Sequence, residues 1–304
     1  MVLDREDARR TKSNFQHQWE QRFLGRAESR ATIFGYDVYE FAGWLCSRYG
    51  EGLYRLARQR KRAWCLDAGC GTAEKTAQFA KFFPFHQVIA MDISDTLVQS
   101  ARHWADVPNL HFVQADLRFP PLRRASFDFV MSIAALHHTP DTRAAFNSVA
   151  SVTKGGGVFV TWIYPKPGEY PSHFFRWHYL QRDWLFLRSA HRLPPRLGML
   201  ICRLHVALLF PFVLPMLKRL DPFGRLIKKH NLSLRQIYDS AVFFTYDNVM
   251  PPNQYRHSIQ EVTGWYEACG FVDVSADRPG VFSGKLRVQQ AHMAGGDGMR
   301  AHMA

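Results

Sequence analysis

The strongest constraint on the fold is an alternation of short apolar runs and longer amphipathic segments between residues 63 and 164. Five apolar runs predict β-strands, at 63–66, 87–91, 110–114, 127–132 and 157–162. Three of the segments between them predict helices, at 74–83, 95–104 and 142–152. Apolar strands that alternate with helices of about ten residues are typical of βαβ units, in which helices cover both faces of a parallel sheet. We therefore expect an α/β core with a doubly wound, mainly parallel sheet.

The composition narrows the setting in which such a core would work. A chain of 304 residues that is 47 % hydrophobic can bury a substantial core. Its five cysteines are an odd number at irregular spacings without a CxxC pair, which argues against a disulfide framework and against a zinc site. We expect no essential metal. The first residues, MVLDREDARRTKSNF, lack the apolar segment of a secretion signal, so we expect a cytoplasmic protein.

A glycine-rich turn follows the first predicted strand, in the stretch CLDAGCGTAEKT at 65–76. Gly69 and Gly71 allow the backbone to approach a ligand, and the next helix would direct its free N–H groups at that ligand. Asp92 lies 21 residues after Gly71, at the end of the second apolar run. An acid at this position of a doubly wound sheet accepts hydrogen bonds from both ribose hydroxyls of a nucleoside. A tight strand-to-helix connection without a ligand is the alternative interpretation.

A third acid, Asp116, follows the third apolar run. Its carboxylate is placed to receive the exocyclic amine of adenine, with Ile93 and Leu117 on the two faces of the ring. The rival ligand is a nicotinamide or flavin dinucleotide. Such a site would require GxGxxG opening the helix, whereas this chain has Ala73 and Glu74 after GCGT and no third glycine at the required spacing. The pattern favours an adenosine-like ligand without a pyrophosphate.

These motifs resemble those of the class I S-adenosylmethionine-dependent methyltransferases. The matching stretches are LDAGCGTA, MDIS, QADL, FDFVMSIAALHHTPD at 127–141 and the GGG turn at 155–157, so the resemblance covers about 63–164. It implies a Rossmann-like fold that ends in an antiparallel hairpin, with S-adenosylmethionine as cofactor. The glycine turn would receive the methionine portion of the cofactor, and Ala73 stands where many members have glycine. The residues implied to bind the cofactor are Asp67, Gly69, Gly71, Asp92, Ile93, Asp116, Leu117, Ala134 and Trp19.

The chain divides into five regions around this core. Residues 1–62 form an N-terminal helical lid region, in which Phe15, Gln18, Trp19 and Phe23 recur at helical spacing; an ordinary amphipathic helix is the alternative. Residues 63–164 form the cofactor-binding core, and 165–258 an insertion that becomes a largely helical cap over the substrate. Residues 259–290 return to the core with a helix at 259–269 and strands at 271–278 and 281–288. Residues 291–304, where AHMA occurs twice, are expected to be a flexible tail.

The insertion is strongly basic and locally apolar. Residues 176–235 contain twelve Lys or Arg against two acids, and 204–217 is a run of fourteen residues without a formal charge but with two prolines. Fourteen residues are fewer than the roughly 20 of an ordinary membrane span. A buried cap helix, or a segment that contacts a membrane or lipid peripherally through 176–235, fits better. A solvated outer face and a nucleic-acid surface are the alternatives. The loop SIAALHHTPD lacks the Asn-Pro-Pro-Tyr type of motif of base methyltransferases, so nucleic acid is disfavoured.

The histidines after the fourth predicted strand are the candidates for catalysis. His137 is our first choice as a general base and His138 the second, because imidazole titrates near neutral pH and the crevice of an α/β sheet lies beyond its strand ends. Trp162, Tyr164, Tyr255 and His257 are predicted to line the acceptor pocket, with ordinary packing as the alternative for each.

The sequence thus predicts a methyltransferase of a small, apolar or amphipathic acceptor, similar to the ubiquinone and menaquinone biosynthesis group. An RNA methyltransferase that uses the basic insertion, and a non-catalytic binding subunit, stay as alternatives. The sequence leaves open the acceptor, the atom that is methylated and the oligomeric state.

Overall fold

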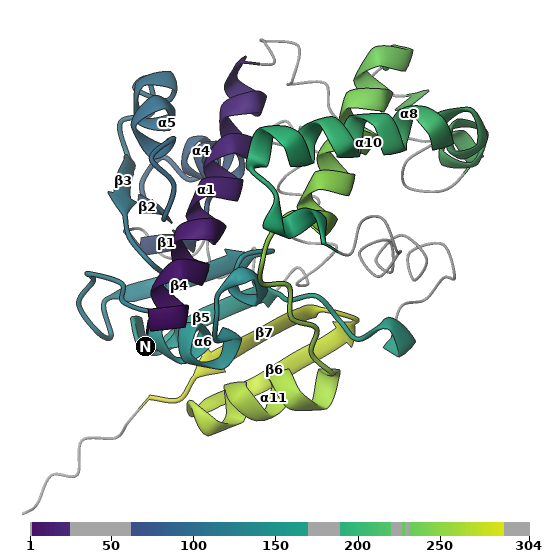
Figure 1. Cartoon of the computed structure of the whole chain (residues 1–304). Coiled ribbons are helices and arrows are strands. Elements are labelled where there is room, and N and C mark those ends of the chain that lie inside the picture. Colours follow the sequence, from purple (N-terminus) through teal and green to yellow (C-terminus); the bar gives the residue numbers. More distant parts are fainter. Residues whose placement is uncertain (1, 25–61, 170–188, 220–226, 229–230, 289–304) are drawn as a thin grey trace, which may run out of the picture.

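The computed structural model describes residues 2–24, 62–169, 189–219, 227–228 and 231–288. Its centre is a seven-stranded sheet with the strand order β3-β2-β1-β4-β5-β7-β6 (Figure 1). The first five strands pair in parallel, and β7 is antiparallel to β5 and β6. The strands are β1 (Trp64–Ala68), β2 (Gln87–Asp92), β3 (Leu110–Gln114), β4 (Phe127–Ile133), β5 (Thr153–Trp162), β6 (Phe271–Arg278) and β7 (Val281–Leu286). The Rossmann-like sheet with a terminal antiparallel hairpin is therefore confirmed.

The fifth strand begins four residues earlier than the sequence predicts, because the GGG turn belongs to the strand. Gly156 has a positive φ of 76°, and the pairing of β4 with β5 shifts register between Phe127 and Phe129. A Cβ atom on Gly157 would lie 2.8 Å from the carbonyl oxygen of Lys154. The glycines therefore form an irregularity inside the strand instead of a turn before it.

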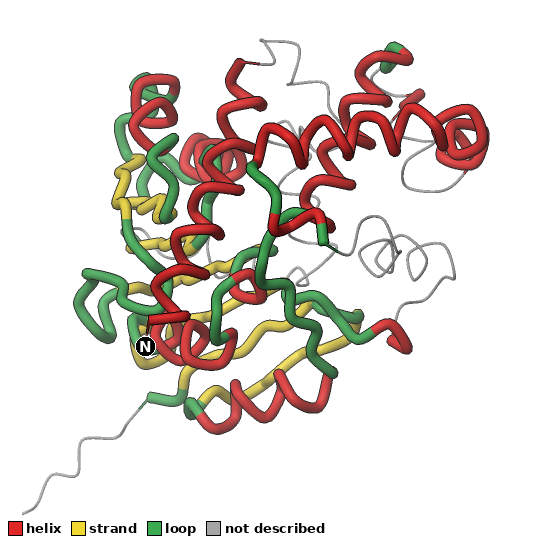
Figure 2. The backbone as a smooth tube through the Cα atoms, viewed as in Figure 1, coloured by secondary structure: helices red, strands yellow, loops and turns green. Residues whose placement is uncertain are grey.

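Helices cover both faces of the sheet (Figure 2). One apolar cluster joins Phe79 of α4 (Glu74–Phe82) to strand residues such as Val88 and Phe129, and the end of α5 (Leu97–His103) packs against it through Trp104. A second cluster joins Phe146 of α6 (Thr142–Ala150) and Tyr266 of α11 (Ile259–Ala268) to Phe159 of β5. Burial on both faces explains why the parallel strands read as continuous apolar runs.

Three further helices lie outside this layered core: α1 (Val2–Leu24), α8 (Pro195–Arg219) and α10 (Leu234–Val249). Figure 1 shows α8 and α10 crossing each other outside the sheet, beside α1. They share a separate apolar cluster with Met199, Cys202 and Val206 on α8 and Tyr246 and Val249 on α10. We call α8 and α10 the arm. The described part of 165–258 is largely helical, as predicted, whereas 25–61, 170–188 and the predicted tail 291–304 fall outside the described residues.

The helix that contains the apolar run is much longer than the run itself. It covers 25 residues and includes Arg196 and Arg203 as well as Pro211 and Pro215. Its stretch Pro195–Pro215 is long and apolar enough, by length and composition, to cross a membrane. The length argument against a span is therefore wrong: arginine is a good helix former, so a charge within an apolar segment does not end the helix.

Candidate functional site

A cleft opens where the strand order reverses, between β1 and β4, at the ends of the parallel strands. It holds about 590 Å³, counting the solvent at its mouth. The walls come from α1, the glycine turn, the ends of β2 and β3, and the loop after β4. The lining residues are Ala8, Thr11, Phe15, Trp19, Gly69, Asp92, Ile93, Asp116, Leu117, Ala134, Ala135, His138, Thr139 and Pro140. The cleft thus brings together seven of the nine predicted cofactor residues.

Every second residue from Gly69 to Ala73, in the turn after β1, has a left-handed backbone conformation. Gly69 has φ +89° and Gly71 has φ +58°. A Cβ atom on Gly69 would lie 2.2 Å from that of Ala135, so this position excludes every side chain. Ala73 adopts the same left-handed region with φ 57° at the N-terminus of α4. A residue with a Cβ atom is strained there, which gives a physical reason why glycine suits this position.

Asp92 connects the turn to the end of β2. Its carboxylate accepts hydrogen bonds from the backbone N–H groups of Gly71 and Ser94, both at 2.9 Å. The side chain lines the cleft and is largely buried, and this burial raises its pKa. Since each carboxylate oxygen has two lone pairs, both oxygens retain acceptor capacity toward a ligand. The position and chemistry suit a pair of ribose hydroxyls.

Asp67 is buried behind the turn and does not line the cleft. Its carboxylate accepts a hydrogen bond from Thr76 Oγ1 of α4 at 2.6 Å. Burial raises the pKa of Asp67 to about 6. Asp67 therefore links β1 to the helix that follows the turn.

Asp116 lines the cleft but is already paired with a residue that sequence reasoning missed. Arg118 donates from Nη2 to Asp116 Oδ2 at 2.7 Å, and its Nε lies 3.2 Å from both carboxylate oxygens. Both side chains are largely shielded from solvent. The pair fixes the carboxylate at the cleft wall, beside Leu117, and Ile93 lines the same cleft.

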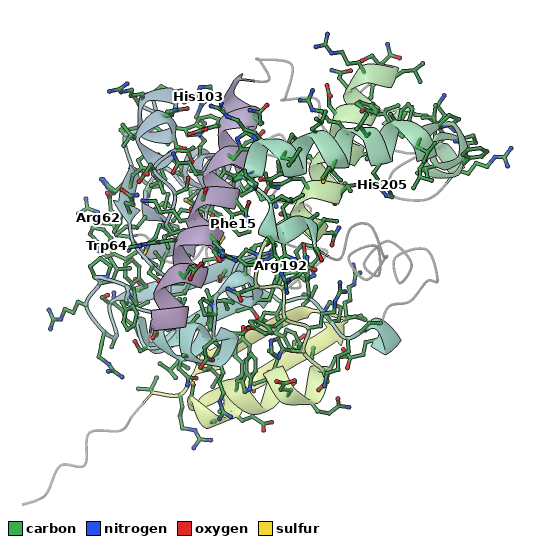
Figure 3. The ribbon with its side chains drawn as sticks, in the orientation of Figure 1. Phe15, Arg62, Trp64, His103, Arg192 and His205 are labelled. Carbon is green, nitrogen blue, oxygen red and sulfur yellow. The ribbon has the colours of Figure 1, made fainter. Side chains whose placement is uncertain are left out.

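Helix α1 forms one wall of the cleft. The indole ring of Trp19 lies against Gly71, where an added Cβ atom would be 2.9 Å from Trp19 Cζ2. Trp19 Nε1 is buried, and the described residues offer it no hydrogen-bond acceptor. The ring of Phe15, which Figure 3 labels, stacks with that of Trp19 and meets the ring of His138 edge-on at 5.0 Å. Helix α1 thus lines the cleft, with a donor beside the glycine turn that has no acceptor among the described residues, and its role as a lid stays a prediction.

Buried polar contacts hold α1 to the arm. Asn14 Nδ2 donates to the carbonyl oxygen of Met250 at 3.0 Å, and Gln18 Nε2 donates to Asp247 Oδ1 at 3.2 Å. Sequence reasoning identified the helical spacing of α1 but not these partners, which lie more than 220 residues away in the chain.

The two adjacent histidines have different surroundings. His137 is fully buried, stacks on Tyr164 at 3.8 Å and lies outside the set of cleft-lining residues. Its burial holds its pKa well below the usual value. His138 lines the cleft, and its Nδ1 lies 3.0 Å from the carbonyl oxygen of Asn253. A carbonyl only accepts, so we infer that Nδ1 carries the proton and Nε2 is the basic nitrogen. The catalytic assignment stays a prediction, but the geometry favours His138 over His137.

None of the four predicted acceptor-pocket residues lines the cleft. Tyr164 donates from its hydroxyl to Asp247 Oδ2 at 2.9 Å, and Trp162 packs edge-on against the Tyr164 ring. His257 Nδ1 lies 2.8 Å from Glu261 Oε1, and Tyr255 is exposed. Their substrate roles stay predictions.

Apart from Phe15, the sequence analysis did not single out the other residues of the cleft wall near His138. The residues of this wall are small, apolar or hydroxylated, and come from α1 and the loop after β4: Ala8, Thr11, Phe15, Ala135, Thr139 and Pro140. The stretch HHTPD and the spacing of Phe15 and Trp19 were the available signals. Among the described residues, no group of three His, Cys, Asp or Glu is arranged to hold a metal ion.

Comparison with known proteins finds similarity to methyltransferases. Residues 66–161 match the family described as "Methyltransferase domain". Over 115 residues, the chain is 34 % identical to an uncharacterized methyltransferase of Mycobacterium bovis; the match covers 37 % of this chain and 57 % of that protein. A trans-aconitate 2-methyltransferase of Deinococcus radiodurans is 34 % identical over 121 residues, which is 40 % of this chain and 45 % of that protein. The chain spans about half the length of these curated relatives.

Among solved structures, the 1,6-didemethyltoxoflavin-N1-methyltransferase of Burkholderia thailandensis, with its substrate and S-adenosylhomocysteine bound, is similar over 93 % of this chain and 90 % of that one. The identity is 15 % and the TM-score 0.46. The family match covers β1 to β5 and does not extend over α1 or the arm.

Proposed function

We propose that residues 66–161, which match the family described as "Methyltransferase domain", form a class I S-adenosylmethionine-dependent methyltransferase, and that the chain transfers a methyl group to a small, apolar or amphipathic acceptor. The cleft holds two kinds of wall. One kind is polar and consists of the glycine turn and the acids, and the other consists of small and apolar side chains with a single histidine. The proposal rests on this division of the cleft.

The residues of the polar wall fit S-adenosylmethionine. Asp92 has acceptor capacity for two hydroxyls, Gly69 excludes any side chain that would narrow the turn, and Trp19 Nε1 is a buried donor without a partner among the described residues. An unsatisfied buried donor carries a free-energy penalty that a ligand acceptor would remove. We assign Asp92 to the ribose, Asp116 with Ile93 and Leu117 to the adenine, and the turn with Trp19 to the methionine portion. When bound, the cofactor supplies a methyl group on a positively charged sulfur.

The apolar wall of the cleft selects the acceptor. Ala8, Phe15, Ala135 and Pro140 give this wall an apolar character, and none of the described lining residues is Lys or Arg. A cleft without a cationic side chain disfavours an acceptor that enters as a carboxylate, because burying an unpaired anion is costly. We therefore expect a different acceptor from that of the trans-aconitate methyltransferase among the relatives.

His138 is the group placed to move a proton. Its ring belongs to the apolar wall, and the carbonyl of Asn253 holds Nδ1 as the donor, so that Nε2 presents a lone pair. While the methyl carbon exchanged its bond to sulfur for a bond to the acceptor's oxygen or nitrogen, leaving a neutral thioether, Nε2 would take the proton that the acceptor loses and later release it to water. General bases of this kind contribute about 10²–10⁴-fold to the rate.

The test is methyl transfer from tritiated S-adenosylmethionine to a matched panel of acceptors. We expect transfer to alkyl-substituted phenols and quinols, and little transfer to trans-aconitate. His138→Gln should lower kcat about 100-fold or more and leave cofactor affinity unchanged. The matched control is His111→Gln, an imidazole on β3 at the sheet edge that does not line the cleft. Preferential methylation of trans-aconitate, or full activity of His138→Gln, would contradict the proposal.

A further inference from the structure

The arm carries an apolar stripe on the outer surface of α8. Leu197, Leu200, Leu204, Leu208 and Phe212 are 44, 51, 63, 71 and 78 % exposed. Their spacing of three and four residues places them on one face of the helix. Single exposed leucines are common, but five large apolar side chains in one row are a contiguous patch of the kind that marks an interaction site.

The opposite face of α8 fixes the direction in which the stripe points. Met199, Cys202 and Val206 are buried against α10. Tyr238 of α10 also donates from its hydroxyl to the carbonyl oxygen of Arg203 at 2.7 Å. Helix α8 therefore cannot rotate to hide the stripe without losing this interface. Among the described residues, nothing covers the stripe enough to lower those exposures.

The charge around the stripe has a single sign. The described segment 189–219 contains five Lys or Arg and no Asp or Glu. Arg196 and Arg203 are exposed and lie one residue from stripe leucines, and Lys218 and Arg219 follow the stripe at the end of the helix. Leucines and a phenylalanine on one face, with cationic side chains beside them, are the pattern of a helix that lies in the interface of an anionic membrane.

We propose that the stripe and its flanking cations dock this protein on an anionic lipid surface, with α8 lying in the plane of the membrane. The leucines enter the boundary between headgroups and acyl chains while the arginines stay at headgroup level. Nucleic acid would pair with the cations but would leave the apolar row exposed to water. The inference goes beyond the methyltransferase activity and does not depend on it.

Surface docking accounts for α8 better than a span does, although the helix is long enough for one. Only 28 % of the apolar window is buried in the protein, but that part is the packed face that holds the arm together. His205 is also buried on this side, about midway along the helix (Figure 3). Crossing a bilayer would strip α8 from α10 and move Arg203 and His205 into hydrocarbon, which is unfavourable.

Docking would also bring the cleft close to the lipid. Helix α1, which lines the cleft, contacts α8 and α10. An amphipathic acceptor dissolved in the membrane would then be concentrated near the cleft; this corollary alone rests on the proposed function.

The experiment is co-sedimentation of the purified full chain with vesicles of phosphatidylcholine alone or with added phosphatidylserine, at low and high salt. We expect binding to the anionic vesicles that weakens with salt. Replacing Leu204, Leu208 and Phe212 together by Ser should lower binding at least about ten-fold. The matched control replaces three similarly exposed apolar residues outside the arm, Phe85, Val98 and Val288, by Ser and should bind as the wild type does.

Calorimetric titration of both triple variants with S-adenosylhomocysteine separates this proposal from the proposed function, because neither set of residues lines the cleft. Three results would overturn surface docking: no binding of the wild type to anionic vesicles, equal loss in the control triple variant, or retention of the protein in vesicles after alkaline carbonate extraction, which indicates a span. A dimer in light scattering that the stripe variant dissociates would also overturn it, since the stripe would then join two copies of the chain.

Discussion

The cleft and the arm both combine charged and apolar side chains, but the two regions arrange these side chains differently. At and behind the cleft wall, hydrogen bonds hold the acidic side chains in place: Asp92 accepts from the backbone N–H groups of Gly71 and Ser94, and Asp67, behind the glycine turn, accepts from Thr76 Oγ1. On the arm, Arg196 and Arg203 lie in water beside exposed leucines. The cleft is therefore specific for the shape of a ligand, whereas the arm is suited to a surface defined only by charge and apolarity.

Single substitutions should therefore have different effects on ligand binding in the two regions. A cleft built from left-handed backbone and buried carboxylates depends on each residue, so one change should weaken ligand binding strongly. An apolar stripe sums many small contributions, so it weakens gradually. Substitutions in the two regions should also be independent, because distant sites that share no partner have additive effects.

The largest effect is expected from Gly69→Ala. The new Cβ atom would lie 2.2 Å from that of Ala135, at a φ of +89° that side chains rarely adopt. Strain and clash together should weaken cofactor binding by about 100-fold or more. Gly264→Ala is the control, since nothing lies within 4 Å of its added Cβ atom. Calorimetry measures the affinity for the cofactor, and binding to vesicles should be unchanged. Equal cofactor affinities of the Gly69 and Gly264 variants would contradict the role of the glycine turn.

Asp92→Asn should weaken cofactor binding by about 10–100-fold. The amide removes the negative charge and replaces one acceptor oxygen by an NH₂ group. Either the Gly71 N–H or the Ser94 N–H then loses its acceptor, and the ribose loses one acceptor too. Asp106→Asn is a suitable control because Asp106 is an exposed partner of Lys81 far from the cleft residues. An unchanged dissociation constant for Asp92→Asn would show that the ribose assignment is wrong.

Asp67→Asn should stabilise the ligand-free protein at pH 8 by about 1–2 kcal/mol. Burial raises the folded-state pKa of Asp67 from 3.8 to about 6, so folding favours the protonated acid. Ionised Asp67 therefore opposes folding fully above pH 6 and ceases to do so as the pH falls through about 6 toward 3.8. Urea unfolding of both proteins at pH 8 and pH 5 measures this, and the advantage of the variant should shrink at pH 5. A constant difference would contradict the account.

The smallest effects come from a pair of helix caps, one in each region. Asp141 accepts from the N–H of Ala144 at the start of α6, and Ser233 accepts from that of Gln236 at the start of α10. Replacing either by Ala should destabilise its helix by about 1 kcal/mol. If core and arm unfold as one unit, both variants shift the same thermal transition. Two transitions, each sensitive to one variant, would show that the arm unfolds separately.

The sequence predicts the cleft well because local rules determine it. A glycine turn between a strand and a helix, and acids at successive strand ends, must meet at one edge of a parallel sheet. Asp92 and Asp116 accordingly line the same cleft. The partner of Asp116 was missed, although Arg118 is only two residues away, because its pairing depends on side-chain conformation.

The sequence predicts the apolar wall of the cleft and the arm less well, for two physical reasons. Contacts such as Gln18 with Asp247 join residues 229 apart, and no periodicity reveals them. Both adjacent histidines of the short 3₁₀ turn are buried, but only His138 lines the cleft, and this difference does not follow from their positions in the sequence. The length of α8 was misjudged because charge was taken as a helix boundary, whereas arginine on the outer face continues the helix.

The most direct test of the central claim is calorimetric titration of the purified chain with S-adenosylmethionine and S-adenosylhomocysteine, beside NAD and an Asp92→Asn control. We expect the wild-type chain to bind both sulfur ligands with micromolar affinity and not to bind NAD. Asp92→Asn should bind the sulfur ligands at least about ten-fold more weakly. Absence of binding of the sulfur ligands, or equal binding by Asp92→Asn, would contradict the assignment of the cleft as the cofactor site.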